Sequence, residues 1–376
     1  MDITNILRSI FDAEAEQINY ASLGSEQWRE IYTFSAEQGI LAFVWDALQD
    51  AAKRDSSTLA NMPRELKIRW ALNVEQIEQK YARQKAVIEK LSVFLAQHNI
   101  KMMVVKGYGL SLCFPRADHR PCGDIDVWFF TEHAEDGRTV RSSAQQKADE
   151  LLREHFNIKI NEDEHHHTVF YVDGVMIENH YDFINIHAHR SNRIIEQKLK
   201  GLVQTTLESV QVGQGVVYFP SADFHSLFLL RHSAAHFAAE KIGIRHLLDW
   251  RYYVEVYNDR IDWRWLEEFA REMNMHRFLY AMHAICVDYL GLPQSKVPSF
   301  DRDKQLEDRV LGEILSPEFS DEKPQNAGYI SSWIFMFKRW WSNRWKHKIV
   351  YREGLFVTFF VQVWSHLLKP KTLKVK

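Results

Sequence analysis

Two carboxylates one residue apart, set at the start of an apolar run, constrain this chain more than any other feature. The segment reads Gly123-Asp124-Ile125-Asp126 and continues into apolar residues. Side chains alternate between the two faces of an extended strand, so Asp124 and Asp126 point the same way while Ile125 turns toward the core. This pattern predicts a cation site on a strand face. The alternative is a pair of ordinary acids at the edge of a strand.

The residues around this strand favour a site that handles phosphates. Lys106-Gly107 ends an apolar run upstream, and Arg120 stands just before the Gly-Asp pair. A lysine beside a glycine turn can meet a phosphate group. Mg²⁺ binds through one or two carboxylates and completes its shell with water and substrate phosphates. Together these features predict a site for phosphoryl transfer.

A second pair of strands supplies a third acid. Asp173-Gly174 lies between two alternating runs, which predicts a β-hairpin. Glu178 and His180 share one face of its second strand, so Glu178 is the candidate third ligand; the alternative is an exposed acid on a hairpin. His180 could orient Glu178 or contact substrate, or be a half-buried strand histidine. His167 ends a run of three histidines and is a candidate on the substrate side. Neighbours on a strand cannot all face one ion, so the run does not predict a zinc site.

The block VVKGYGLSLCFPRADHRPCGDIDVWF resembles the core of the polymerase-β-like nucleotidyltransferases, in a bacterial branch where a Lys-Gly turn precedes an Arg-Pro-x-Gly-Asp-x-Asp strand. The resemblance implies that Asp124 and Asp126 bind catalytic metals and that a carboxylate on a later strand joins them. Glu178 takes that place, where relatives often carry Asp. The implied cofactor is Mg²⁺, as two ions, with Mn²⁺ as an alternative.

The same resemblance implies a nucleotide pocket formed by Lys106, Gly107, Arg120 and Gly123. Many relatives carry Gly-Ser at the turn, whereas this chain carries Gly-Tyr-Gly. The hydroxyl that would contact a phosphate is therefore either missing or supplied by Ser111.

The length of 376 residues suggests more than one domain. Helical spacing dominates residues 1–98, strands and the chemical motifs occupy 99–220, and helical spacing returns in 221–376. We therefore predict an α+β protein, with a small mixed sheet as the nucleotidyltransferase core between two helical regions. Three scattered cysteines favour a reducing cytoplasm over a disulfide framework. Neither a secretory signal nor a transmembrane segment is evident.

The carboxyl-terminal residues 338–376 differ in composition. They hold ten Lys or Arg against one acid, Glu353, inside a chain of net charge −3, and tryptophans cluster in and beside them. Basic residues mixed with aromatics can bind nucleic acid or lie on an anionic bilayer. The apolar run 355–364 is too short to span a membrane and could instead be a buried helix. The alternatives are therefore a packed helix, a membrane surface and a polyanionic or glycan-linked acceptor.

These features predict a cytoplasmic, metal-dependent nucleotidyltransferase that moves a nucleoside monophosphate from an NTP to an acceptor hydroxyl and releases pyrophosphate. The acceptor could be a small molecule, RNA or protein. The competing hypothesis is a catalytically silent module with the same fold, which binds nucleotide, nucleic acid or another polyanion.

Overall fold

The computed structural model describes residues 3–12, 18–131, 143–162, 166–187, 189–203, 205, 207–239, 241–319 and 329–357. They form two compact units. The sheet unit comprises Asn19–Ala36 and Ile40–Phe228. The helical unit comprises Met1–Ile18, Glu37–Gly39 and Leu229–Lys376.

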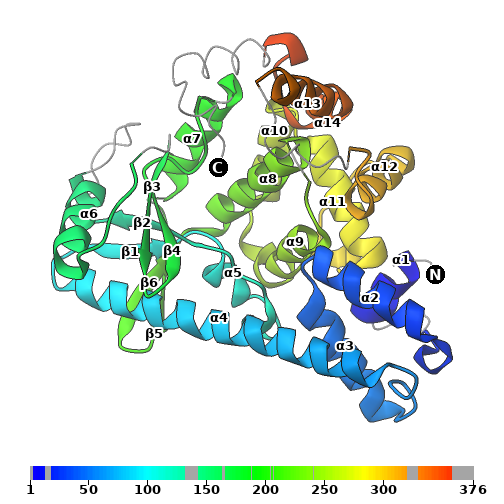
Figure 1. Ribbon diagram of the computed structural model, residues 1–376. Coiled ribbons are helices and arrows are strands. Elements are labelled where there is room, and N and C mark those ends of the chain that lie inside the picture. Colours follow the sequence, from blue (N-terminus) through cyan, green and yellow to red (C-terminus); the bar gives the residue numbers. More distant parts are fainter. Residues whose placement is uncertain are drawn as a thin grey trace. The chain divides into compact units, whose positions relative to one another are not determined.

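The centre of the sheet unit is a six-stranded mixed sheet with the order β3-β4-β2-β1-β6-β5 (Figure 1). Its inner strands β1 and β2 are antiparallel, β2 and β4 are parallel, and β1 and β6 are parallel. Two hairpins, β3-β4 and β5-β6, form the outer parts. The strands are β1 (Lys101–Val104), β2 (Ile125–Phe130), β3 (His167–Val172), β4 (Val175–His180), β5 (Glu208–Val212) and β6 (Gly215–Phe219).

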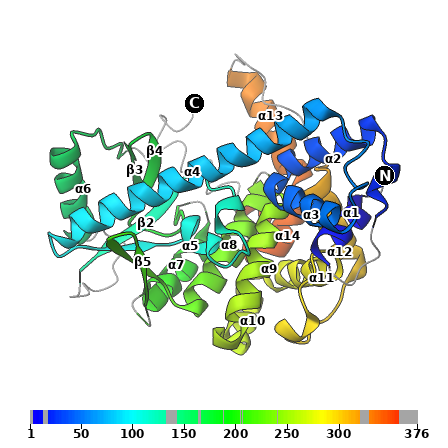
Figure 2. The same ribbon diagram turned by 90° about the horizontal axis from the view of Figure 1, so that it is seen from below.

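Helices surround this sheet. The long helix α4 contains neither Gly nor Pro and contacts β1, β4, β5 and β6 (Figures 1 and 2). It buries Val87, Ile88, Leu91 and Leu95, which helical spacing places on one side. The helices are α2 (Ser25–Glu37), α3 (Leu41–Arg54), α4 (Arg64–Ala96), α5 (Tyr108–Ser111), α6 (Ser143–Phe156) and α7 (Arg190–Val203), with 3₁₀ turns at Tyr20–Ser22 and Ala117–His119.

The predicted hairpin is confirmed. Asp173 and Gly174 connect β3 to β4 and both have positive φ, +50° and +78°. A two-residue turn with positive φ at both positions matches the right-handed twist of the strands it joins. The turn fixes the register of the hairpin, in which Glu178 pairs with Val169 and His180 pairs with His167.

The helical unit packs around α11, in which every residue from Phe278 to Cys286 is buried. This helix contacts α1, α9, α10, α12 and α14. Helix α8 (Ala222–Ala239) begins in the sheet unit and ends in the helical unit. The other helices are α1 (Ile3–Phe11), α9 (Ile244–Tyr257), α10 (Trp263–Glu272), α11 (His276–Tyr289), α12 (Lys304–Leu315), α13 (Tyr329–Ser342) and α14 (Arg344–Val350), with 3₁₀ turns at Asn258–Arg260 and Gln294–Lys296.

The α+β class and the mixed sheet between helical regions are confirmed. The domain boundaries near 98 and 220 stay predictions. Residues 358–364 of the carboxyl-terminal apolar run, and the lysines beyond them, lie outside the described residues. No helix in the described ranges has the length and apolar content needed to cross a bilayer.

Candidate active site

Two of the three predicted carboxylates lie on adjacent strands of the sheet, and the third lies just before one of them. Asp126 lies in β2 and Glu178 lies in β4, and the parallel register places the two residues directly opposite each other. Adjacent strands are about 4.8 Å apart, so side chains on the same face are close. Asp124 immediately precedes β2, two residues before Asp126. The fold therefore brings together acids that the sequence could assign only to separate strands.

Two basic groups contact Asp126. The Nζ atom of Lys106 lies 3.1 Å from its Oδ1 atom, and Nε2 of His180 lies 3.0 Å from the same oxygen. His180 also approaches Oε2 of Glu178 at 3.5 Å. Its other ring nitrogen, Nδ1, lies 3.1 Å from the backbone oxygen of Asp182. An imidazole with acceptors at both nitrogens is suited to carry both protons.

These contacts set the protonation states of the cluster. Burial opposes ionisation of Asp126, but Lys106 and His180 outweigh it and hold its pKa well below the usual range. Burial alone would lower the pKa of His180, whereas its hydrogen bonds to Asp126 and Glu178 raise it to about 9. Burial and the neighbouring charge of Asp126 raise the pKa of Asp124. The cluster therefore favours an ionised Asp126 and a protonated His180, and it opposes ionisation of Asp124.

The donor set fits a divalent cation. Asp126 is fully buried, and its Oδ2 atom has no hydrogen-bond partner among the described residues. A buried carboxylate oxygen normally has one. One oxygen each from Asp126 and Glu178 and one ring nitrogen of His180 lie within 4.8 Å of one another. Carboxylates suit Mg²⁺ and Mn²⁺, whereas a doubly protonated His180 ring orients the two carboxylates and is not itself a ligand.

The histidines at the start of β3 also lie at this cluster. His167 Nε2 is 3.7 Å from Oε1 of Glu178. His166 precedes the strand, and its ring lies 4.3 Å from that of His167 and 5.7 Å from that of His180. The alternation that separates neighbouring side chains applies only within a regular strand. His166 lies outside β3, so its side chain can approach Glu178 and His180 together with that of His167. The expectation that neighbouring histidines face opposite ways therefore does not apply to His166.

The lysine-glycine turn is held from several sides. Gly107 has a φ of +62°, a region that glycine enters without strain. Its carbonyl accepts a hydrogen bond from Nη1 of Arg120 at 3.1 Å. His225 of α8 contacts the carbonyl of Val105, one residue before Lys106. Arg120 is only 4% exposed, so it supports the turn from inside the protein.

The remaining predicted nucleotide residues differ in accessibility. Ser111 is fully buried and its hydroxyl donates to the carbonyl of Tyr108 at 2.6 Å, so a phosphate contact would require this segment to rearrange. Gly109 packs against Phe219, whose ring would lie 2.8 Å from an added Cβ. This contact explains the second glycine of the turn. Gly123 is exposed, with no atom within 4 Å of such a Cβ.

Polar side chains of α4 and α6 form hydrogen bonds with the segments that carry the site. Gln84 of α4 donates to the carbonyl of Gly123 at 3.1 Å. Asp149 of α6 accepts hydrogen bonds from Thr168 and Asn179, each at 2.9 Å. Gln145 of the same helix donates to the carbonyl of His180. Sequence reasoning missed these residues because their partners are distant in the chain and no local motif links them.

The chain that follows β4 is fixed by a buried charge network. The backbone N–H groups of Phe183 and Ile184 donate to the carboxyl group of Glu196 at 3.1 Å. Lys200 pairs with Asp182 and lies 3.6 Å from Glu196. Burial raises the pKa of Glu196 to about 7, although Lys200 opposes the shift. This network determines where the chain leaves the strand that carries Glu178.

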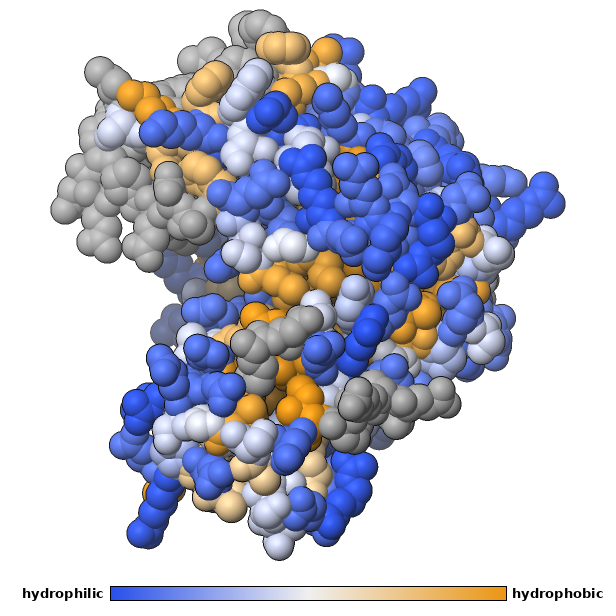
Figure 3. Space-filling view, turned by 90° about the vertical axis from the view of Figure 1, so that its right-hand side faces the viewer, coloured by the Kyte–Doolittle hydropathy of each residue, from blue (hydrophilic) through white to orange (hydrophobic). Residues whose placement is uncertain are grey.

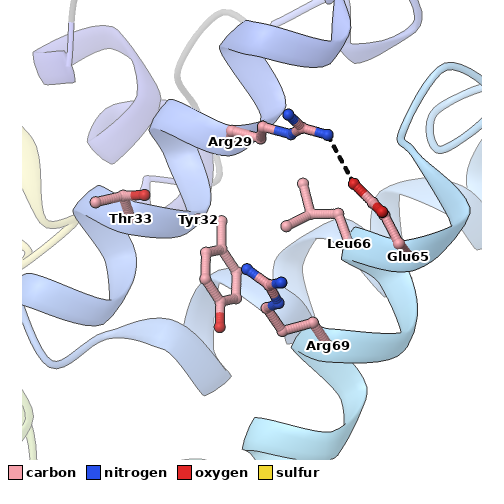
Figure 4. A pocket seen from close by; sticks show the side chains of 6 residues that line it. All are labelled: Arg29, Tyr32, Thr33, Glu65, Leu66 and Arg69. Carbon is pink, nitrogen blue, oxygen red and sulfur yellow. Dashed lines mark hydrogen bonds and ion pairs between the residues drawn. The ribbon is translucent and has the colours of Figure 1, made fainter.

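Two cavities of the sheet unit contain none of these residues. One, of about 290 Å³, lies between α2 and α4 and is lined by Arg29, Tyr32, Thr33, Glu65, Leu66 and Arg69 (Figure 4). Its Arg29–Glu65 pair is exposed. Another, of about 510 Å³, contains Arg116 and His119. Both are paired with carboxylates of Asp46 and Glu78.

Comparisons with known proteins bear on this arrangement. No curated protein matches the chain. Among solved structures, an antigenic nucleotidyltransferase-like protein from Paracoccidioides brasiliensis is similar over 46% of this chain and 75% of its own, with 14% sequence identity and a TM-score of 0.31. The model of a family described as uncharacterised nucleotidyltransferase matches residues 24–291, more than half of the chain and all of the cluster. The chain therefore belongs to this family of uncharacterised nucleotidyltransferases.

Proposed function

We propose that the protein transfers a nucleoside monophosphate from an NTP to an acceptor hydroxyl and releases pyrophosphate. The acceptor oxygen forms a bond to the α-phosphorus, the bond between that phosphorus and the pyrophosphate oxygen breaks, and the acceptor proton leaves. The observation that carries the proposal is the register of Asp126 opposite Glu178 on parallel strands, with Lys106 at 3.1 Å from Asp126. Family membership supports nucleotidyl transfer in general terms.

Each residue has an assigned task in this proposal. Asp124, Asp126 and Glu178 would hold Mg²⁺, which supplies neutralisation of charge on the attacking and leaving oxygens when bound. Glu178, the most accessible part of the Asp126–Glu178–His180 group, positions the acceptor hydroxyl. Lys106 faces the phosphates, and its position depends on the turn at Gly107. The protein contributes mainly positioning and charge complementarity, as in other phosphoryl transfers.

His180 and His167 are positioning residues in this scheme. His180 contacts both Asp126 and Glu178, so it orients the two carboxylates relative to each other. His167 approaches the opposite oxygen of Glu178. Arg120 and Ser111 hold the turn and the short helix after it, since both side chains are buried.

The test uses purified protein with each α-labelled NTP, Mg²⁺ and a cell extract as the source of acceptor. We expect label in RNA, protein or a small molecule, and we expect Asp124→Asn and Asp126→Asn to lose it while keeping the wild-type circular dichroism spectrum. Full activity in both variants would overturn the mechanism. Label on the protein itself would identify the acceptor as the protein.

One observation favours a catalytically silent module. His180 and Lys106 already neutralise Asp126, which is the arrangement expected if basic side chains had replaced the metal. Calorimetry separates the two. An enzyme should bind NTP more tightly with Mg²⁺ than with EDTA and should release pyrophosphate when acceptor is present. A silent module should bind equally in both conditions and release none.

A further inference from the structure

Exposed apolar side chains gather at one place in the helical unit. Among the side chains that the structure describes, the exposed Phe and Trp residues all lie between residues 334 and 357, together with exposed aliphatic ones. Large exposed apolar patches on a soluble surface usually mark contact sites. The residues are Ile334, Phe337, Trp341, Phe356 and Val357.

Three of these residues form a stripe on α13. Ile334, Phe337 and Trp341 are spaced by three and four residues, which places them on one side of a helix. They are 52%, 53% and 48% exposed, so none of the residues that the structure describes buries that side. The rings of Phe337 and Trp341 are 6.4 Å apart, and Trp340 lies 6.5 Å from Phe356. The segment after α14 therefore continues the same patch.

Exposed cations occur on α13 and on α14, which follows it. Lys338, Arg344 and Lys348 are exposed, and the guanidinium of Arg344 lies 4.8 Å from the centre of the Trp341 ring. Lys346 is different, because it is buried and paired with Glu313 at 2.6 Å. Only some of the basic residues counted in the sequence can therefore meet a partner. The described residues 329–357 contain one acid, Glu353, so the charge of the patch is positive. Figure 3 shows apolar (orange) and hydrophilic (blue) residues side by side at the upper end of the view.

We propose that this surface, here called the α13 face, binds an anionic lipid bilayer. The α13 face consists of the five apolar residues together with Lys338, Arg344 and Lys348. An amphipathic helix of this kind lies in the plane of the interface, with aromatic and aliphatic groups among the lipid chains and Lys or Arg at the headgroups. The proposal does not depend on the proposed transfer reaction.

A bilayer explains the aliphatic members of the face better than a nucleic acid does. Single-stranded nucleic acid binds aromatic rings by stacking and basic groups through its backbone. Ile334 and Val357 offer no ring for stacking, and they contribute only if the partner buries them away from water.

The experiment is co-sedimentation of the full chain with phosphatidylcholine vesicles, with and without phosphatidylserine. We expect binding to the anionic vesicles, and weakening by salt because the headgroup attraction is screened. The double variant Phe337→Ser/Trp341→Ser should lose at least about tenfold in affinity. Lys338→Gln/Lys348→Gln should weaken binding and reduce its dependence on salt. The matched control is Ile68→Ser/Leu72→Ser, an exposed apolar pair on α4 at 51% and 52%, which should bind like wild type.

A second measurement locates the contact without depending on loss of binding. Brominated lipids quench a tryptophan that enters the bilayer. Trp341→Phe keeps an apolar ring, so it should still bind but show less quenching than wild type. Binding that survives Phe337→Ser/Trp341→Ser unchanged would overturn the proposal. So would tight binding to single-stranded RNA with no binding to anionic vesicles, because that result would assign the face to a nucleic acid.

Discussion

The charged cluster of the sheet unit and the α13 face of the helical unit both place charged groups beside apolar ones. The charges are buried in the cluster and exposed in the α13 face. Asp126 is completely buried and its charge is balanced by Lys106 and His180 at about hydrogen-bond distance. In the α13 face, Trp341 is 48% exposed and cations such as Lys348 point to solvent. The cluster is arranged before any ligand binds, whereas the α13 face presents groups that the described residues leave exposed.

This difference has an energetic meaning. Charges in a dry environment interact strongly, so a change of one buried partner lowers activity and also lowers the free energy of unfolding, even where the variant still folds. Exposed groups are hydrated whether or not the chain is folded, so their replacement changes binding and leaves stability almost unaffected. The predictions below test that contrast.

The largest effect is expected for Asp126→Asn. Removing one charge from a preorganised site that stabilises a transition state typically costs about 10²–10³-fold in rate, and loss of a metal ligand should reach the upper end or exceed it. The assay is incorporation of label from α-labelled NTP. Asp173→Asn, in the exposed hairpin turn where it pairs with Lys90, is the control and should keep activity. Equal activity of Asp126→Asn and Asp173→Asn would contradict the contrast between buried and exposed charges.

The buried network beside the site should make stability depend on pH. The folded-state pKa of Glu196, about 7, lies above its ordinary value of 4.5. The native state therefore holds more protons than the unfolded chain in this window, and stability falls as pH rises through it. Glu196→Gln removes this titration. Its unfolding free energy relative to wild type should increase between pH 5 and pH 8, on the order of 2 kcal/mol.

Urea unfolding of both proteins at the two pH values measures this difference. Because other titrating groups are common to both proteins, only the difference between them is informative. A constant difference would show that Glu196 does not titrate in this window.

A smaller effect, on the free energy of unfolding, should distinguish Gly109 from Gly123 near the site. Gly109→Ala places a Cβ 2.8 Å from the ring of Phe219 and should destabilise the protein by about 1–3 kcal/mol through overpacking. Gly123→Ala meets no atom within 4 Å and should change stability by less than about 0.5 kcal/mol. Thermal unfolding distinguishes the pair, and similar losses in both would contradict the packing argument.

The smallest effect belongs to the α13 face. Trp341→Ser should change the unfolding free energy by no more than about 0.5 kcal/mol, because the ring is exposed. Trp250→Ser, at a buried position, should cost about 3–5 kcal/mol. Denaturant unfolding of the two variants gives the comparison directly. A large loss in Trp341→Ser would mean that the stripe packs against the protein, and the contrast between the two regions would fail.

Much of the local structure near the site could be predicted from sequence. Period-two alternation correctly placed Asp126 in a strand and Glu178 and His180 on the second strand of a hairpin. The Asp173-Gly174 pair correctly marked the turn. These predictions succeeded because the geometry depends on residues that are close in the chain.

Other features of the site had no local signal. The sequence suggested phosphate roles for Arg120 and Ser111, but both side chains are buried and contact the backbone of the turn region. Their burial depends on packing against distant residues, which spacing does not reveal. Gln84 and His225 likewise reach the site from α4 and α8.

The amino-acid sequence alone determined which residues share a strand face, where the hairpin turns, and that acids, a lysine and a glycine turn occur in one segment. Only the tertiary structure decided that Asp126 stands opposite Glu178, that Lys106 and His180 converge on one oxygen, and which basic residues near the carboxyl end remain exposed. Alternation along a strand is fixed by backbone geometry. The pairing of strands that are not consecutive depends on how the whole apolar core packs.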